Sequence, residues 1–175
     1  MYLIVDLEAT CDEDKRIPRE EMEVIEIGAV MLDKQYNEVD RFTTFVKPVV
    51  HTVLTPFCIQ LTSIRQSQVD KAPGFSEAIG RLETWFSPYA PELWSSWGGY
   101  DARQFEQDCQ RHGVANPLAN LRHVNAKEEY ARMTGRRACG LGKALRDLNL
   151  RFEGTQHRGV DDAVNIGRVV AKLFG

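Results

Sequence analysis

Long apolar segments are absent from this chain of 175 residues, although 43% of its residues are hydrophobic. No run approaches the roughly 20 apolar residues that a membrane-spanning helix needs. The opening MYLIV is too short for a signal peptide, and the acidic Asp6 follows it at once. We therefore expect no membrane association and a cytoplasmic location.

Cysteine pairs of the kind that hold zinc are also absent. The four cysteines are Cys11, Cys58, Cys109 and Cys139, and no two are close enough in the sequence to form a CxxC half-site. A structural zinc cluster is therefore not expected. Free thiols, buried or partly buried, are the expected state, as in proteins of a reducing compartment.

A surplus of basic residues is missing as well. Lys and Arg number 22 against 25 Asp and Glu, which gives a formal net charge of −3. A protein that binds nucleic acid through its phosphate backbone alone usually carries an excess of positive charge. Any contact with phosphates must therefore be local, or must be assisted by bound cations.

Apolar periodicity predicts one α/β domain that spans residues 1–175. Strands are expected at 2–5, 24–32, 42–46, 93–97 and 123–125. Helices are expected at 76–86 and 102–112, and near 141–148 and 163–173. The first three strands are close together, which predicts an antiparallel meander, whereas the later strands alternate with helices, which predicts parallel pairing. The expected fold is a mixed five-stranded sheet flanked by helices.

Two acidic residues, Asp6 and Glu8, stand at the end of the first predicted strand in the sequence DLEAT. Side chains two positions apart on a strand point to the same face, so the two carboxylates can share a cation. A D-x-E pair arises by chance about once in a chain of this length. Two solvated acids are therefore the alternative on this motif alone.

Two further acidic motifs follow, each with an ordinary structural alternative. Asp101 comes after the fourth predicted strand, and Asp101 with Gln104 also fits an N-cap and capping box for the next helix. In HRGVDDA, His157 precedes Asp162 by five residues. Asp161 and Asp162 also fit the acidic first turn of a helix, and a single histidine in a loop is usually a surface residue.

The combination is more specific than its parts. Asp6, Glu8, Asp101 and Asp162 all stand at boundaries of strands or helices, and together they offer the oxygen ligands that Mg²⁺ or Mn²⁺ prefers over zinc. Two such ions about 4 Å apart can stabilise the attacking and leaving oxygens of a phosphodiester displacement. An imidazole such as that of His157 can take a proton from water near neutral pH. The set therefore predicts a hydrolase.

These motifs resemble the DEDDh family of 3′→5′ exonucleases. Asp6 and Glu8 match the first family motif, Asp101 the second, and Asp162 with His157 the third, where the H-x-x-x-x-D spacing selects Asp162 over Asp161. Other stretches agree, and the resemblance spans nearly the whole chain: EVIEIGAV, FVKP, FCIQLTSIRQSQVD and GLGKALRDLNL.

The resemblance implies a ribonuclease H-like fold and a single exonuclease domain that removes nucleoside 5′-monophosphates from 3′ ends. It implies two Mg²⁺ (or Mn²⁺) ions held by the four carboxylates, with His157 as the general base and Glu8 also in the catalytic set. The implied partners are 3′ ends of single-stranded RNA or DNA. No protein partner is implied.

Within the family, the LT-x-I-x-Q segment and the aromatic residue before Asp101 resemble the RNA-directed branch. That branch includes the enhanced-RNA-interference and histone-mRNA exonucleases and KapD-type bacterial proteins. The resemblance implies that Glu8, His157 and the backbone at Ala9 and Thr10 contact the terminal nucleotide, and that an apolar and aromatic slot accepts its base. The residues implied for that slot are Leu61 and Tyr100; the branch often has tryptophan at the latter position.

Three alternatives stay open at this point. The same five residues would serve a DNA repair or proofreading exonuclease, or an oligoribonuclease. An inactive relative that binds nucleic acid is the third possibility, although none of the five residues is lost. Basic residues near the third motif could form a rim for RNA, or could simply be solvated helix faces: Arg132, Arg136, Arg137, Lys143 and Arg158.

Overall fold

The computed structural model describes residues 1–14 and 16–175. In this part of the chain the strands are β1 (Tyr2–Ala9), β2 (Val24–Leu32), β3 (Glu38–Phe45), β4 (Leu93–Ser96) and β5 (Arg122–Asn125). The α-helices are α1 (Pro56–Thr62), α2 (Gln66–Asp70), α3 (Phe75–Phe86), α4 (Tyr100–His112), α5 (Ala126–Thr134), α6 (Leu141–Asp147) and α7 (Gly159–Phe174). Short 3₁₀ turns lie at Arg19–Glu21 and Ser87–Tyr89.

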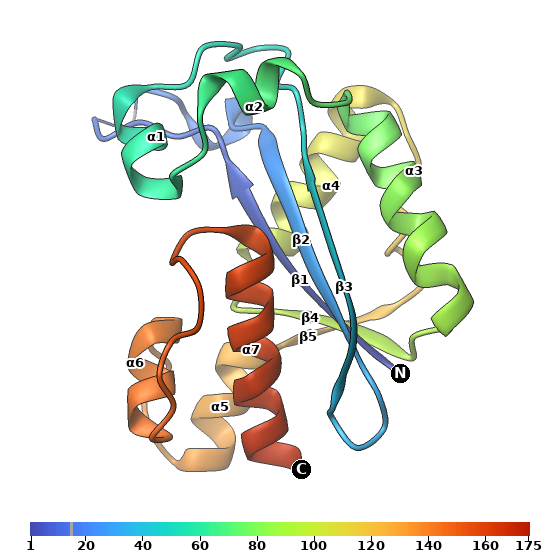
Figure 1. Ribbon diagram of the computed structural model, residues 1–175, viewed down its shortest axis with the longest axis vertical. Coiled ribbons are helices and arrows are strands. Elements are labelled where there is room, and N and C mark those ends of the chain that lie inside the picture. Colours follow the sequence, from blue (N-terminus) through green and yellow to red (C-terminus); the bar gives the residue numbers. More distant parts are fainter. Residues whose placement is uncertain (15) are drawn as a thin grey trace.

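The five strands form one sheet in the order β3-β2-β1-β4-β5. β2 pairs antiparallel with both β1 and β3, whereas β4 pairs parallel with both β1 and β5. The expected mixed sheet, an antiparallel meander followed by parallel strands, is therefore confirmed. Helices α3 and α4 cover one face, and α7 covers the other together with α5 and α6 (Figure 1).

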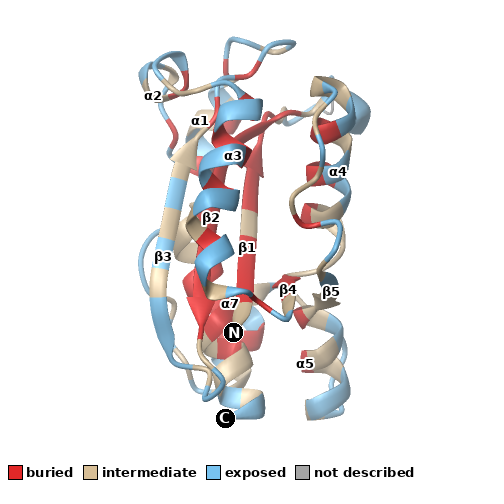
Figure 2. Cartoon of the chain, turned by 90° about the vertical axis from the view of Figure 1, so that its right-hand side faces the viewer, coloured by how far each residue is buried: buried red, intermediate tan, exposed pale blue. Residues whose placement is uncertain are grey.

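The two central strands are almost entirely buried (Figure 2). All nine residues of β2 are buried, as expected for a strand that has neighbours on both sides and helices on both faces. β3 stands at the edge, and its residues are partly or fully exposed. Side chains on β1 are therefore surrounded by neighbouring strands and helices on both faces.

Side chains of β1 alternate between the two faces, as the pleat requires. Leu3, Val5 and Leu7 enter the core under α3 and α4, and Ile4 enters the core under α7. Asp6 and Glu8 continue the series of Ile4, so both carboxylates face the side of the sheet that α7 covers. On the opposite face, α3 is bonded to the edge strand β3, because Trp85 of α3 donates from Nε1 to Asp40 on β3 at 2.8 Å.

Several element boundaries differ from the prediction. β1 continues to Ala9 rather than ending at residue 5, because Asp6 and Glu8 pair with Gly28 and Glu26 of β2. β3 begins at Glu38 rather than at residue 42, because it also pairs along β2. Partners across the sheet, which local apolar patterns do not reveal, therefore set both strand lengths.

Three helices were not predicted: α1, α2 and α5. Their ends nevertheless carry ordinary capping signals. Thr55 accepts a hydrogen bond from the Cys58 amide and is followed by Pro56, and Asn125 accepts from the amides of Lys127 and Glu128. These helices have five to nine residues, too few for a strong apolar period to stand out.

The four cysteines are free thiols, as expected. Cys58 and Cys109 are buried, and Cys11 and Cys139 are partly buried. No helix within the described residues combines the length and apolar character that crossing a bilayer requires.

The first turn of α7 lies directly on β2 through two glycines. A Cβ on Gly28 would stand 1.9 Å from the carbonyl carbon of Gly159 and 2.0 Å from the Val160 nitrogen. A Cβ on Gly159 would stand 2.8 Å from the Gly28 nitrogen and 3.1 Å from the Asp6 carbonyl oxygen. Backbone packs against backbone here, so neither position has room for a side chain.

We predict that Gly28→Ala destabilises the protein by about 3 kcal/mol or more, since the added methyl group meets main-chain atoms that cannot rotate away. Gly80→Ala, on the exposed side of α3, is the matched control because a Cβ there meets nothing within 4 Å. The control should gain up to about 1 kcal/mol from improved helix propensity. Chemical denaturation of both variants checks this, and equal stabilities would contradict the close contact.

Candidate active site

Four carboxylates from three separate elements come together beside the end of β1. Asp6 and Glu8 stand on β1, Asp101 in the first turn of α4, and Asp162 in the first turn of α7. Each of the four lies within the electrostatic influence of at least one of the others. The structure therefore brings together residues that are up to 156 positions apart in the sequence.

Topology explains how Asp101 arrives there. β4 runs parallel to β1, so the turn after β4 lies near the carboxyl end of β1, where ligands of open α/β sheets commonly bind. Asp101 is 5% exposed, and its Oδ1 accepts a hydrogen bond from the Leu7 amide at 3.1 Å. This side chain is thereby held against β1.

The N-cap reading of Asp101 is wrong. α4 begins one residue earlier, at Tyr100, with Gly99 at the N-cap and no side-chain cap bond. Gln104 also does not complete a capping box, because its side-chain amide donates to the Met22 carbonyl and to Asp108, each at 2.9 Å. The side chain of Asp101 therefore does not cap α4, and it accepts a hydrogen bond from β1 instead.

The third motif adds Asp162 and His157. One ligand atom from each of Glu8, His157 and Asp162 lies within 4.8 Å of the other two. Asp162 Oδ2 is buried and has no hydrogen-bond partner among the described residues. Asp161 is used differently, since its Oδ2 accepts from the Thr155 amide at 2.8 Å. The unpartnered oxygen of Asp162 is therefore available to a cation.

Burial makes these carboxyl groups hard to ionise without a cation. Burial raises the pKa of Glu8 to about 9, and it raises the pKa of Asp6 well above its ordinary value, with Asp101 and Glu8 adding repulsion. Burial also raises the pKa of Asp101 and that of Asp162 to about 6, although backbone hydrogen bonds partly oppose both shifts. A buried group of oxygen ligands with these properties fits hard divalent cations.

His157 belongs to an exposed loop, since residues 153–157 are all exposed. Its backbone adopts a left-handed conformation with φ of 59°. That conformation is uncommon outside glycine, and such strain is often found at functional sites. The loop places the imidazole at the open side of the carboxylates, where water can reach it.

The residues expected to contact the substrate differ in how accessible they are. Ala9 and Thr10 are both buried, and the Thr10 amide already donates to the Glu23 carbonyl at 2.8 Å, so it is not free for a ribose. Leu61, 36% exposed, lines a pocket of about 470 Å³ beside α1. Tyr100 is half-buried, and its hydroxyl donates to Gln104 at 3.1 Å.

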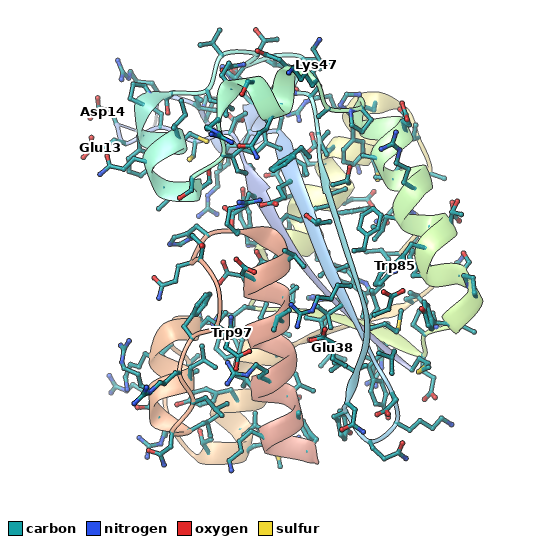
Figure 3. All side chains as sticks on the ribbon, viewed as in Figure 1. Glu13, Asp14, Glu38, Lys47, Trp85 and Trp97 are labelled. Carbon is teal, nitrogen blue, oxygen red and sulfur yellow. The ribbon has the colours of Figure 1, made fainter. Side chains whose placement is uncertain are left out.

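Trp97 is engaged elsewhere. Its indole Nε1 donates to the Cys139 carbonyl at 3.0 Å, and the centre of its ring lies 6.0 Å from that of Tyr130. Figure 3 shows Trp97 between α6 and α7. Trp97 therefore stabilises the packing of α5, α6 and α7, and Tyr100 is the aromatic residue next to the acidic cluster.

The basic residues near the third motif are mostly paired with acids. Arg132 pairs with Glu129, and both Arg136 and Lys143 pair with Asp147. Arg158 turns inward and pairs with Glu26, a buried residue of β2 that was not among the expected site residues. Four of the five basic side chains therefore have an acidic partner, and Arg136 and Lys143 share the single carboxylate of Asp147. In the sequence, Glu26 is recognisable as the one acidic residue inside the apolar strand VIEIGAVML.

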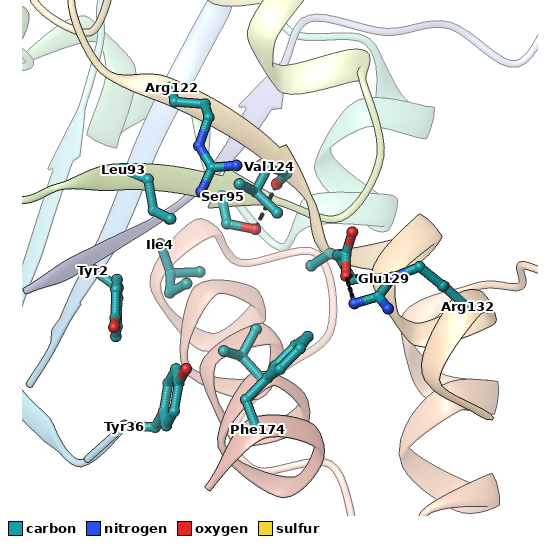
Figure 4. Close-up of a pocket in the computed structure, with 12 residues that line it drawn as sticks. Tyr2, Ile4, Tyr36, Leu93, Ser95, Arg122, Val124, Glu129, Arg132 and Phe174 are labelled. Atoms are coloured by element: carbon teal, nitrogen blue, oxygen red, sulfur yellow. Dashed lines mark hydrogen bonds and ion pairs between the residues drawn. The ribbon is translucent and has the colours of Figure 1, made fainter. Parts of the chain in front are cut away.

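A separate pocket of about 320 Å³, partly open to solvent, lies at the other end of the sheet (Figure 4). It is lined by the first residues of the parallel strands, including Tyr2, Leu93 and Arg122, and by Tyr36 and Phe174. Tyr2 and Glu8 are six residues apart on β1, which corresponds to about 20 Å along a strand. This pocket is therefore not part of the acidic site.

The chain is similar to known exonucleases over nearly its whole length. The RNase_T family model, described as exonuclease, matches residues 3–170. ERI1 exoribonuclease 3 of Homo sapiens and 3′-5′ exoribonuclease 1 of Homo sapiens are each 31% identical over 98% of this chain. The match covers 53% and 51% of those two proteins, so the chain spans about half the length of these relatives.

Solved structures are similar over nearly the whole chain. The nuclease domain of 3′hExo, a DEDDh family member bound to rAMP, matches with a TM-score of 0.89 and 28% identity, over 97% of this chain and 89% of that one. A 3′-exonuclease that recognises the 3′ end of the histone mRNA stem-loop matches with a TM-score of 0.89 and 27% identity, over 97% of this chain and 62% of that one.

We predict that Mg²⁺ stabilises the folded protein, and more strongly at about pH 8 than at about pH 6. Because burial raises the pKa values of Glu8, Asp101 and Asp162, the metal-free folded state binds more protons than the unfolded chain above the ordinary values of 4.5 and 3.8. Stability of the metal-free protein therefore falls as pH rises through about 6 and then toward about 9. A bound cation removes that loss.

Thermal unfolding with EDTA or with MgCl₂ at both pH values measures the effect. Saturation at about 100 times Kd corresponds to about 2.7 kcal/mol. Asp162→Asn should lose most of the stabilisation by Mg²⁺. A Tm that does not respond to Mg²⁺ or Mn²⁺ at either pH would contradict a cation site at these carboxylates.

Proposed function

Because this chain belongs to the exonuclease family whose model matches residues 3–170, we propose that it hydrolyses single-stranded RNA from the 3′ end and releases nucleoside 5′-monophosphates. The observation that carries this proposal is the approach of Glu8, His157 and Asp162 to within 4.8 Å, beside the buried Asp6 and Asp101. This arrangement has both parts that phosphodiester hydrolysis needs, a cation site and an exposed proton acceptor.

Asp6, Glu8, Asp101 and Asp162 would hold two Mg²⁺ or Mn²⁺ ions. When bound, the ions neutralise charge on the phosphodiester and on the departing oxygen. The Asp101 carboxylate is kept in place by the Leu7 amide, and Asp162 offers its unpartnered Oδ2. The protein thus supplies a rigid set of ligands rather than flexible surface acids.

His157 acts as the general base. Its exposed imidazole accepts the proton of the attacking water, and the loop leaves that water free to enter from solvent. Glu8 stands next to both His157 and Asp162, and it also contacts the terminal nucleotide. Attack on the last phosphodiester breaks the bond to the 3′ oxygen of the preceding nucleotide, so the product carries its phosphate on the 5′ oxygen.

The substrate is proposed to be RNA because the relatives named above are exoribonucleases and 3′hExo binds rAMP. Leu61 on α1 and Tyr100 on α4 would flank the terminal base, an apolar and aromatic slot that accepts any base. The backbone near Ala9 contacts the terminal ribose, with Thr10 beside it. The location is proposed to be cytoplasmic.

Two end-labelled single-stranded oligonucleotides of equal sequence, one RNA and one DNA, test the proposal with Mg²⁺, Mn²⁺ or EDTA. We expect a ladder that shortens from the 3′ end, faster on RNA and absent with EDTA. Faster cleavage of DNA would keep the mechanism and replace the RNA substrate, as in a repair exonuclease. Binding without cleavage in either metal would refute the enzymatic function.

Variants of the acidic cluster and of His157 should separate cation binding from proton transfer. Asp6→Ala, Asp101→Ala and Asp162→Ala should nearly abolish cleavage, because each removes a cation ligand. His157→Ala should lower kcat by about 10² to 10⁴-fold and leave stabilisation by Mg²⁺ nearly unchanged. Asp40→Asn is the control, because Asp40 binds Trp85 and Tyr89 on the α3 face of the sheet. Cleavage at the wild-type rate by His157→Ala would exclude it as the base.

A further inference from the structure

Glu26 is a fifth carboxylate beside the four proposed ligands. It is completely buried in β2, and it stands opposite Glu8 in the register of β1 and β2. The register shifts between Glu8 and Ala9 at this point, a bulge of the kind that often lies next to active sites. A buried carboxylate in this position could be taken for another cation ligand.

The hydrogen bonds of Glu26 show that it serves a different purpose. Oε2 accepts from Arg158 Nε and from the Gly159 amide, both at 3.0 Å. Oε1 accepts from Arg158 Nη2 at 2.8 Å and from Thr43 Oγ1 at 3.4 Å. With both oxygens used by donors of the protein, Glu26 has no free position for a cation.

Arg158 is held on a second side as well. Its guanidinium lies 5.3 Å from the centre of the Phe45 ring, and its side chain is 25% exposed. A planar guanidinium bound through two nitrogens and stacked on a ring has little freedom to move. The ion pair therefore fixes the main chain at 158–159, where α7 begins.

His157 is the residue immediately before this fixed point. It has a left-handed backbone and an exposed side chain, and it follows four exposed residues, 153–156. The loop before it is also anchored at two points: Glu153 exchanges hydrogen bonds with Asn165 at 3.1 and 2.8 Å, and the Thr155 amide donates to Asp161 at 2.8 Å. Of these anchors, the one at Arg158 and Gly159 directly adjoins His157 in the chain and therefore lies nearest to the imidazole.

We infer that the Glu26–Arg158 ion pair is a positioning element that holds His157 toward Glu8 and Asp162. This role rests on the proposed function, in which His157 is the general base. Glu26 contacts neither His157 nor a substrate, so it acts through Arg158 and the Gly159 amide. Without its negative charge, the guanidinium loses its partner and the loop loses the anchor that sets the imidazole.

Glu26→Gln and Arg158→Lys test this role in the full chain. The first keeps the shape of the side chain and removes its charge, and the second keeps the charge and removes the paired nitrogens. Asp108→Asn is the matched control, because Asp108 is also a fully buried carboxylate that pairs with an arginine, Arg111, and accepts from a backbone amide. Asp108 is on α4 and does not contact the His157 loop.

Single-turnover and steady-state assays on labelled RNA should show that Glu26→Gln and Arg158→Lys lower kcat by about 10- to 100-fold, the usual loss when a residue that orients a functional group is removed. KM should stay near the wild-type value. Asp108→Asn, compared at a Tm equal to that of Glu26→Gln, should keep the wild-type kcat. The double variant Glu26→Gln with His157→Ala should be no slower than His157→Ala alone, since Glu26 acts through that side chain.

Other outcomes overturn the inference. Equal kcat in Glu26→Gln and Asp108→Asn would show that the pair has only a structural role, and so would losses that multiply in the double variant. If Glu26→Gln fails to fold, the same comparison is made with Arg158→Lys. His157→Ala at the wild-type rate would refute the proposed base itself, which distinguishes failure of the function from failure of the positioning role.

Discussion

The contact between Gly28 on β2 and Gly159 at the start of α7 is the constraint on which the site depends. A Cβ on Gly28 would overlap the Gly159 carbonyl carbon at 1.9 Å, so only glycine permits this approach. The contact brings the first turn of α7 onto the sheet next to Asp6, which pairs with Gly28. Asp162, in that first turn, therefore lies near the carboxylates of β1. His157, in the loop just before the helix, lies near Glu8 and Asp162. A helix displaced by one side chain would separate the third motif from the first.

This close packing also determines the electrostatics. Asp6, Glu8, Asp101 and Asp162 stand in a partly closed space where burial raises each pKa. Glu26 lies beside them but is neutralised by Arg158 and by the Gly159 amide. The charge of Glu26 is thus neutralised within the protein, whereas the charges of the other four carboxylates can be neutralised by bound cations. In the proposed function, the acidic chain, with its net charge of −3, approaches RNA through those cations rather than through a basic surface.

The sequence was informative wherever a single element decides the outcome. The pleat of β1 places Asp6 and Glu8 on one face whatever surrounds them, and the order of strands and helices predicts the mixed sheet. It was less informative at short elements. α1 and α5, which are capped by Thr55 and Asn125, lack a long apolar period, and the ends of β1 and β3 follow their partners on β2. The role of Asp101 as a cap was wrong because α4 begins one residue before it.

The sequence by itself determined the residue types and spacing of the three motifs, because D-x-E on a strand and H-x-x-x-x-D before a helix are local patterns. Only the tertiary structure decided which other groups share their space. In the folded chain, Arg158 pairs with the buried Glu26, and Asp161 accepts a hydrogen bond from the Thr155 amide. Asp162 Oδ2 has no hydrogen-bond partner among the described residues. The physical reason is distance along the chain: Glu26 and Arg158 are 132 residues apart, and their contact exists only because β2 and α7 pack through glycine.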